Sequence, residues 1–210
     1  MRTDQGRGPA PLPRPGPLPW PGRPRRGKPF RVLILGGARS GKSVTAERLL
    51  CGRDQVDYVA TGPVADAADP EWAERIRLHQ ERRPAHWTTL ETLELDRVLT
   101  RARADVPVLV DCLSTWLAGV MAESGLWDGA ADGAMGAGKK VAERVDGLVD
   151  AWRSTRRHVV AVSNEVGSGV VPATASGGRF RDELGVLNTR IAAECEQVWL
   201  CTAGIARRLR

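Results

Sequence analysis

Residues 32–43 read Val-Leu-Ile-Leu-Gly-Gly-Ala-Arg-Ser-Gly-Lys-Ser, an apolar run that stops at two glycines and ends in a Gly-Lys-Ser triplet. The run Val32–Leu35 predicts a buried strand, and Ser43–Leu50 predicts a helix after it. Between them, Gly36–Ser43 fits GxxxxGK[ST], in which glycines let backbone N–H groups turn inward around phosphate oxygens. An ordinary glycine-rich turn is the alternative, but the flanking strand and helix favour a loop that binds a nucleoside triphosphate.

Two side chains of this loop, and one acid further along the chain, have expected chemical parts. Lys42 should reach the β- and γ-phosphates, and the Ser43 hydroxyl should join the shell of a Mg²⁺ ion. Mg²⁺ also needs a carboxylate at the end of a neighbouring strand, where Asp111 is placed. The other interpretation of Asp111 is a cap for a helix that begins near Ser114. Weaker metal candidates, because each precedes its strand, are Asp57 and Asp105.

Strands and helices alternate along the rest of the chain. Asp69 and Pro70 predict a helix start, with a capping acceptor and a proline in the first turn, and Pro84 predicts its end. The Gly/Ala-rich stretch Gly125–Gly138 predicts a flexible loop. The alternation predicts one α/β domain over residues 30–210, a mostly parallel sheet flanked by helices as in RecA-like P-loop NTPases. The other strands expected are Asp57–Thr61, Val106–Val110, Val159–Ser163 and Val198–Thr202, and the other helices Lys139–Arg153 and Phe180–Glu196.

The basic charge is concentrated at the N-terminus. The net charge is +6, but residues 1–31 carry eight basic side chains against one acid, so the remainder is nearly neutral. Residues 1–29 also hold nine of the fourteen prolines and predict a disordered extension. A docking arm for nucleic acid or another polyanion is the alternative for this extension, but the neutral body predicts no nucleic-acid partner.

No segment resembles a signal peptide, and none approaches the roughly 18 apolar residues that span a bilayer. The four cysteines form neither a CxxC pair nor a disulfide scaffold, which predicts reduced thiols and a cytoplasmic protein.

His79 lies inside the predicted helix 70–83, on the face it shares with Trp72, Ile76 and Arg83. One interpretation is a half-buried histidine that packs. The other is a nucleophile, because a neutral imidazole can attack an α-phosphorus and hold the nucleotidyl group as a phosphoramidate. Neighbouring arginines would offset the charge on that phosphate. Spacing alone leaves both interpretations open, and the arginines in question are Arg75, Arg82 and Arg83.

Six segments occur in order along the chain. They are GGARSGKS at 36–43, RIRLHQERRPAHW at 75–87, VDCLSTW at 110–116, SNEVGSGVVP at 163–172, FRD at 180–182 and VWL at 198–200. In this combination the chain closely resembles the adenosylcobinamide kinase / adenosylcobinamide-phosphate guanylyltransferase family, over about residues 31–208.

The resemblance implies a bifunctional enzyme of cobalamin nucleotide-loop assembly. The terminal phosphate of ATP or GTP would pass to the aminopropanol hydroxyl of adenosylcobinamide. GTP would then guanylylate His79, and the GMP would pass to adenosylcobinamide phosphate to give adenosylcobinamide-GDP. The resemblance also implies a homo-oligomer. A kinase of another small alcohol, with a structural His79, and a nucleotide-dependent binding module with a basic tail are the alternative functions.

Carried over position by position, the resemblance implies nucleotide contacts in and around the loop and the histidine helix. Glu91 by itself would be an acid in a solvated turn. The loop Gly167–Pro172 is a candidate for the corrinoid-phosphate site, with a plain strand-to-loop turn as the alternative. The implied nucleotide contacts are Gly36, Gly37, Ala38, Arg39, Ser40, Gly41, Lys42, Ser43, Ala60, Thr61, Gly62, Gln80, Glu81, Arg82, Arg83, Glu91 and Asp111.

Two departures from the family pattern stand out. Leu78 occupies a position where many relatives have a second histidine, which favours His79 as the sole nucleophile. Ala173–Gly178 is small and neutral where the family carries more arginine, leaving Arg179 in its place.

Overall fold

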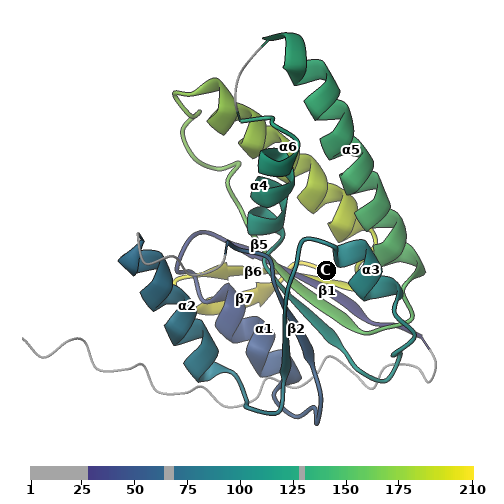
Figure 1. Cartoon of the computed structure of the whole chain (residues 1–210). Coiled ribbons are helices and arrows are strands. Elements are labelled where there is room, and N and C mark those ends of the chain that lie inside the picture. The colour runs from purple at the N-terminus through teal and green to yellow at the C-terminus, as the bar shows by residue number, and fades with distance from the viewer. Residues whose placement is uncertain (1–27, 64–68, 128–130) are drawn as a thin grey trace, which may run out of the picture.

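The computed structural model describes residues 28–63, 69–127 and 131–210, which form one seven-stranded sheet covered by helices on both faces (Figure 1). The strand order is β3-β2-β4-β5-β1-β6-β7, and only β6 and β7 pair antiparallel. The strands are β1 Arg31–Gly36, β2 Asp57–Ala60, β3 Thr88–Glu91, β4 Val108–Asp111, β5 Val159–Asn164, β6 Gln197–Thr202 and β7 Ile205–Arg208. The helices are α1 Lys42–Leu50, α2 Pro70–Arg82, α3 Leu95–Thr100, α4 Leu113–Glu123, α5 Ala131–Ser154 and α6 Ala175–Ala193.

Strand β1 lies in the interior of the sheet, hydrogen-bonded to β5 on one side and to β6 on the other. Val32, Leu33 and Ile34 are completely buried. Strands covered on both faces have continuous apolar runs instead of alternating patterns, which explains the unbroken run before the glycines. The predicted strand, the predicted helix α1 and the parallel sheet are confirmed.

The sheet separates two layers of core. Leu33 faces the layer with α3, α4, α5 and α6, whereas the next residue, Ile34, faces the layer with α1, as the alternation of strand side chains requires. Figure 1 shows α4, α5 and α6 together on one face and α1 beside α2 on the other. Because its strands are parallel apart from β7, the sheet brings the carboxyl ends of β1, β2, β4 and β5 to one edge, where α/β proteins hold ligands.

The predicted flexible loop Gly125–Gly138 is wrong over its second half, because α5 already begins at Ala131. Ala137 and Val141 are buried in the core, so tertiary packing outweighs the helix-weakening glycines around them. Residues 128–130 lie outside the described part of the chain. Helix α6 begins at Ala175, five residues before the predicted start at Phe180. Elements that the pattern did not predict are β3, α3 and β7.

Within the described ranges, no helix is both long enough and apolar enough to cross a bilayer. The predicted N-terminal extension, apart from residues 28 and 29, falls outside those ranges, as does the docking-arm alternative. The predicted homo-oligomer and cytoplasmic location stay predictions.

Candidate active site

The loop Gly36–Ser43 connects the carboxyl end of β1 to α1 and is held by close contacts. A Cβ on Gly36 would lie 2.4 Å from the Cys201 carbonyl oxygen, so this position requires glycine. The Lys42 ammonium lies inside the loop and donates a hydrogen bond to the Gly37 carbonyl at 2.7 Å. Gly204, in the turn between β6 and β7, donates its N–H to the Ser40 carbonyl at 3.0 Å.

The N-terminus of α1 has the features of an anion site. Gly41 is the N-cap residue, in a left-handed conformation with φ 95°, and no side chain accepts a hydrogen bond from the first turn. The first turn also contains no acidic residue. Uncapped N–H groups and the positive end of the helix dipole therefore face the loop, as phosphate binding requires.

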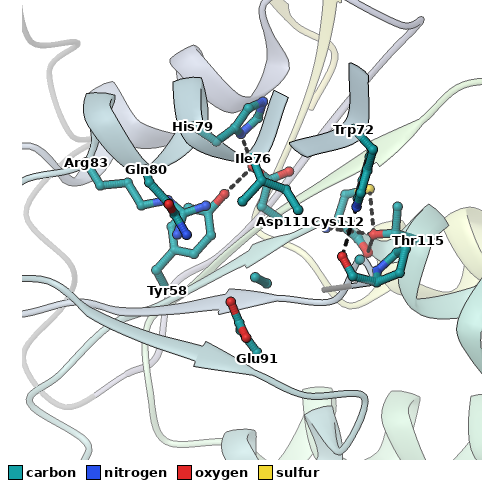
Figure 2. Close-up of a pocket in the computed structure, with 13 residues that line it drawn as sticks. Tyr58, Trp72, Ile76, His79, Gln80, Arg83, Glu91, Asp111, Cys112 and Thr115 are labelled. Atoms are coloured by element: carbon teal, nitrogen blue, oxygen red, sulfur yellow. Dashed lines mark hydrogen bonds and ion pairs between the residues drawn. The ribbon is translucent and has the colours of Figure 1, made fainter. Parts of the chain in front are cut away.

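Helix α2 places His79 at the same edge of the sheet. Its start agrees with the prediction: the Asp69 carboxylate accepts a hydrogen bond from the Trp72 N–H at 2.9 Å, and Pro70 occupies the first turn. The side chain of His79 is 22% exposed, and its Nδ1 lies 3.4 Å from Oδ2 of Asp111. The face predicted for Trp72, Ile76, His79 and Arg83 is confirmed, because all four line one pocket (Figure 2).

Asp111, at the end of β4, connects the loop to the histidine. Its Oδ1 accepts a hydrogen bond from the Ser43 hydroxyl at 3.3 Å. Its Oδ2 accepts one from the Tyr58 hydroxyl at 2.5 Å and also faces His79 Nδ1 (Figure 2). Because a carboxylate only accepts, Nδ1 of His79 carries the hydrogen of this contact, and in the neutral ring the lone pair is then on Nε2.

The environment of Asp111 and Tyr58 fixes their charge states. Burial by itself would raise the pKa of Asp111, but hydrogen bonds from His79, Tyr58 and Ser43 hold that pKa below its ordinary value. Burial, and then the nearby Asp111 charge, raise the pKa of Tyr58 well above its ordinary value. Asp111 is therefore an anion near neutral pH and Tyr58 a neutral donor.

Two of the arginines expected around His79 contact other groups. Arg82 pairs with Glu47 of α1, with an Nη2–Oε1 distance of 3.3 Å. The Arg83 guanidinium carbon lies 3.5 Å from the centre of the Tyr58 ring, a cation–π contact. The side chain of Arg75 lies outside the described part of the chain. Among the described side chains, the charged group recorded in contact with His79 is the Asp111 carboxylate, at 3.4 Å.

The pocket beside His79 is a cavity of ≈ 80 Å³ between α2 and the carboxyl ends of β2, β3 and β4. Gly62 makes room for the Trp72 ring, since a Cβ there would lie 2.7 Å from that ring. Figure 2 shows Glu91 across the opening from Tyr58 and His79. Of the predicted nucleotide contacts, the cavity is lined by Ala60, Gly62, Gln80, Arg83, Glu91 and Asp111.

Three predicted contacts lie away from that cavity. Thr61 is buried, and its hydroxyl donates to the Cys112 carbonyl at 2.6 Å. Glu81 is exposed and pairs with Arg77 one turn earlier in α2. Arg82 points to Glu47, as described above. In the loop itself, Ser40 and Lys42 are buried, whereas Gly37, Ala38 and Arg39 are exposed.

The chemistry of the donors at Ser43 and Asp111 suits Mg²⁺. Both present oxygen atoms, which hard cations prefer, and Mg²⁺ in nucleotide sites takes only one or two protein ligands beside water and phosphate. Among the described residues no group of three or more His, Cys, Asp or Glu side chains gathers to hold a metal by itself. The donors present thus fit a metal that arrives with phosphates.

Sequence patterns missed Tyr58 and Glu47 as parts of this site. Tyr58 stands inside an apolar strand and reads as core. Glu47 reads as a solvated acid on α1, yet its side chain is only 12% exposed, and burial raises its pKa despite the attraction of Arg82. The sequence did contain a signal for Tyr58: it is a tyrosine in a predicted strand, and another predicted strand ends on the carboxylate Asp111.

Comparison with known proteins finds relatives that match almost the whole described domain. The sequence model of a family described as "Cobinamide kinase / cobinamide phosphate guanyltransferase" matches residues 32–209. The bifunctional adenosylcobalamin biosynthesis protein CobP of Pseudomonas aeruginosa is 41% identical over 188 residues, covering 86% of this chain and 98% of that protein. The bifunctional adenosylcobalamin biosynthesis protein CobU of Salmonella typhimurium is 36% identical over 187 residues, covering 85% of this chain and 99% of that protein.

Among solved structures, an ATPase from the type III secretion system of pathogenic bacteria superposes with a TM-score of 0.53 at 12% identity. The match covers 82% of this chain but only 51% of that one. At this identity the likeness concerns the fold alone, and it agrees with the predicted mostly parallel sheet flanked by helices.

Proposed function

This chain belongs to the cobinamide kinase / cobinamide phosphate guanyltransferase family, and we propose that it catalyses both reactions, with the loop Gly36–Ser43 as the triphosphate site and His79 as the guanylylated nucleophile. The observation that carries this proposal is the position of Asp111. Its one carboxylate contacts both Ser43 of the loop and the imidazole of His79.

In the kinase step, the loop N–H groups and Lys42 bind the β- and γ-phosphates of ATP or GTP. Mg²⁺ bound through Ser43 and Asp111 would neutralise the charge that develops between these phosphates. The aminopropanol hydroxyl of adenosylcobinamide attacks the γ-phosphorus and loses its proton to solvent, the bond from the γ-phosphorus to the β-phosphate oxygen breaks, and a nucleoside diphosphate leaves. The chain contributes mainly position and positive charge, which is what phosphoryl transfer needs from a protein.

In the guanylyl step, the Nε2 lone pair of His79 attacks the α-phosphorus of GTP. The α-phosphorus–oxygen bond to the β-phosphate breaks and pyrophosphate leaves. The Asp111 carboxylate, 3.4 Å from Nδ1, stabilises the positive charge that the ring then carries. A phosphate oxygen of adenosylcobinamide phosphate next attacks the same phosphorus, the nitrogen–phosphorus bond breaks, and adenosylcobinamide-GDP forms.

GTP labelled at the α-phosphate tests this proposal directly. Wild-type protein should acquire an acid-labile, base-stable label, whereas GTP labelled at the γ-phosphate should leave the protein unlabelled. His79→Ala should lose the label. The matched control is His86→Ala, because His86 is exposed and contacts the Arg53 carbonyl outside the pocket. A label retained in His79→Ala would refute the nucleophile, and γ-transfer to a small alcohol without any protein adduct would support a simple kinase.

Lys42→Ala tests the shared triphosphate site. Removal of a preorganised cation from the phosphates should lower both kinase turnover and guanylylation, each by about 100-fold or more. Near-normal turnover in this variant would count against the whole mechanism.

The corrinoid is proposed to bind at the loop after β5. The loop begins beside the proposed triphosphate loop, since Glu165 donates its N–H to the Gly36 carbonyl at 3.1 Å. Two side chains further along, Val170 and Val171, are 94% and 69% exposed, an apolar surface available to a macrocycle. Next to the loop, a groove of ≈ 440 Å³ is lined by Gly167 and one face of α6.

Val170→Glu should therefore raise the KM for adenosylcobinamide while the protein still takes up α-label from GTP at the wild-type rate. An unchanged KM for the corrinoid would place its binding elsewhere.

A further inference from the structure

Tyr58 is the only tyrosine in the chain. Tyr58 is 1% exposed, and its hydroxyl donates a hydrogen bond to Asp111 Oδ2. Phenylalanine would fill the same space in the core, so the hydroxyl must be explained separately from the ring. Its acceptor is the oxygen atom that faces Nδ1 of His79.

The two oxygens of Asp111 have separate partners. Oδ1 accepts from Ser43, on the side of the phosphate loop, and Oδ2 accepts from Tyr58, on the side of His79. A carboxylate otherwise rotates with little resistance about its last side-chain bond. The two hydroxyls together fix which oxygen faces the imidazole, and that of Tyr58 is the one bonded to this oxygen itself, at 2.5 Å against 3.3 Å for Ser43.

The ring of Tyr58 is held in turn by Arg83, the C-cap residue directly after α2. The Arg83 guanidinium carbon lies 3.5 Å from the ring centre, and its Nη1 donates to Thr89 of β3 at 3.3 Å. Figure 2 shows Arg83 and Gln80 beside the ring and His79 above the hydroxyl. The tyrosine thus contacts both the end of the histidine helix and the carboxylate that faces the histidine.

We infer that Tyr58 is a positioning residue for guanylyl transfer: its hydroxyl holds Asp111 Oδ2 against Nδ1 of His79 and so aims Nε2 at the α-phosphorus. The inference rests on the proposed guanylyl transfer through His79. Tyr58 gains and loses no bond to the substrate in either half of that transfer. It acts through Asp111, whose Oδ2 keeps the Nδ1–H in place while the nitrogen–phosphorus bond forms and breaks.

The kinase step depends less on this contact. Oδ1, the oxygen on the loop side, keeps its partner Ser43 when the phenol is removed. A purely structural role for Tyr58, in contrast, would lower both activities together through loss of folded protein. The ratio of the two rates therefore separates positioning from packing.

The experiment measures that ratio in Tyr58→Phe. Single-turnover transfer from α-labelled GTP to the protein should slow by about tenfold or more, as for other residues that orient a reacting group, with the KM for GTP unchanged. Phosphorylation of adenosylcobinamide should change by less than about threefold. Thr155→Val is the control: it also removes one buried hydroxyl, which donates to the Leu99 carbonyl at 2.7 Å and accepts from the Arg157 N–H at 3.2 Å, at the amino ends of the strands. In the control the ratio should equal that of wild type.

A second measurement keeps the inference testable if Tyr58→Phe folds poorly. Protein labelled with ¹³C at the tyrosine ζ carbon gives one resonance, because the chain has one tyrosine. This resonance should shift when wild-type protein is guanylylated, and should not respond when GTP is added to His79→Ala at a concentration that labels wild type.

Equal slowing of both activities in Tyr58→Phe, or a tyrosine resonance that ignores guanylylation, would overturn the positioning role. Either result leaves the proposed function standing as long as His79→Ala loses the α-label. A label retained in His79→Ala overturns the proposed function itself, and the two failures are thus distinguishable.

Discussion

Two aspartates, one at the amino end of a strand and one at the carboxyl end of the neighbouring strand, have contrasting surroundings. Asp57 begins β2 and Asp111 ends β4, the strand beside it, and their side chains are only 2% and 10% exposed. Asp57 faces a permanent cation, the completely buried Arg157, at 2.6 Å. Asp111 faces two hydroxyls and an imidazole at the wall of a pocket.

Each of the three guanidinium nitrogens of Arg157, the cation beside Asp57, donates a hydrogen bond. Arg157 donates to the carbonyls of Val106 and Val98 as well as to the carboxylate, so donors and acceptors are matched inside the core. Asp111 is stabilised by two hydroxyls and an imidazole instead of a permanent cation, which leaves its negative charge available to a metal or to a charged imidazole. The contrast teaches that a buried carboxylate serves structure when a fixed cation neutralises it, and serves chemistry when its charge is left for a ligand.

Arg157→Met gives the largest effect expected from this contrast. It leaves Asp57 buried without its main partner and should lower the free energy of unfolding by about 3 to 5 kcal/mol. Urea unfolding followed by tryptophan fluorescence would measure this loss. Arg103→Met is the control, because Arg103 is 46% exposed and 3.5 Å from the same carboxylate, and it should cost less than about 1 kcal/mol. Equal losses in the two variants would contradict the structural assignment of Asp57 and Arg157.

Asp111→Asn, in contrast to Arg157→Met, should lower activity strongly and stability little. The amide keeps an acceptor for Tyr58 but removes the charge, so both activities should fall by about 100-fold or more, while the free energy of unfolding changes by no more than about 1 kcal/mol. Kinase and α-label assays beside urea unfolding would measure both quantities. If Asp111→Asn is fully active, or unfolds as readily as Arg157→Met, then Asp111 does not differ from Asp57 in having a chemical instead of a structural role.

The sequence separates these aspartates only in part. Parallel strands present their carboxyl ends at one edge, so a carboxylate that follows a strand is a site candidate and one that precedes a strand is a poor one. Asp111 and the loop Gly36–Ser43 are predictable for this reason, since both depend on residues close together in the chain. The Arg157–Asp57 pair joins residues 100 positions apart, which no local pattern reveals.

The same limit explains what was missed around His79. Helical spacing identified the face that carries it, but the partner Asp111 and the phenol behind that partner come from two other strands. The start of α5 was misjudged for a related reason: glycines weaken a helix locally, whereas packing of Ala137 and Val141 on the core decides whether the helix forms. Local preference is readable from sequence, and long-range contacts are not.

A pH titration sharpens the comparison at Asp111. Hydrogen bonds from its partners hold the pKa of Asp111 below its ordinary value in the folded protein. The stability from this carboxylate is therefore fully present above the pKa of the unfolded chain, about 4, and is lost as the pH falls through the lower folded value. The stability advantage of wild type over Asp111→Asn should shrink from about pH 4 downward. An advantage that grows with acidity would contradict the hydrogen-bond arrangement.

Glu47→Gln should give the smallest change in stability, and its pH dependence should be opposite in sign to that of Asp111→Asn. Glu47 lies near Asp111, and its pKa is raised, because burial disfavours its charge more than Arg82 favours it. A raised carboxyl pKa means that the group adds stability below its unfolded pKa and loses that contribution as the pH rises through the folded value. At pH 7 to 8 the glutamine variant should therefore be as stable as wild type or more stable, by less than about 1 kcal/mol. Urea unfolding at pH 4 and pH 8 would measure this difference, with Arg82→Gln as the control that leaves the carboxylate without its cation and should destabilise at pH 8. If Glu47→Gln is clearly less stable than wild type at pH 8, then the Arg82 pair outweighs burial, and Glu47 resembles Asp57 in being neutralised by a fixed cation.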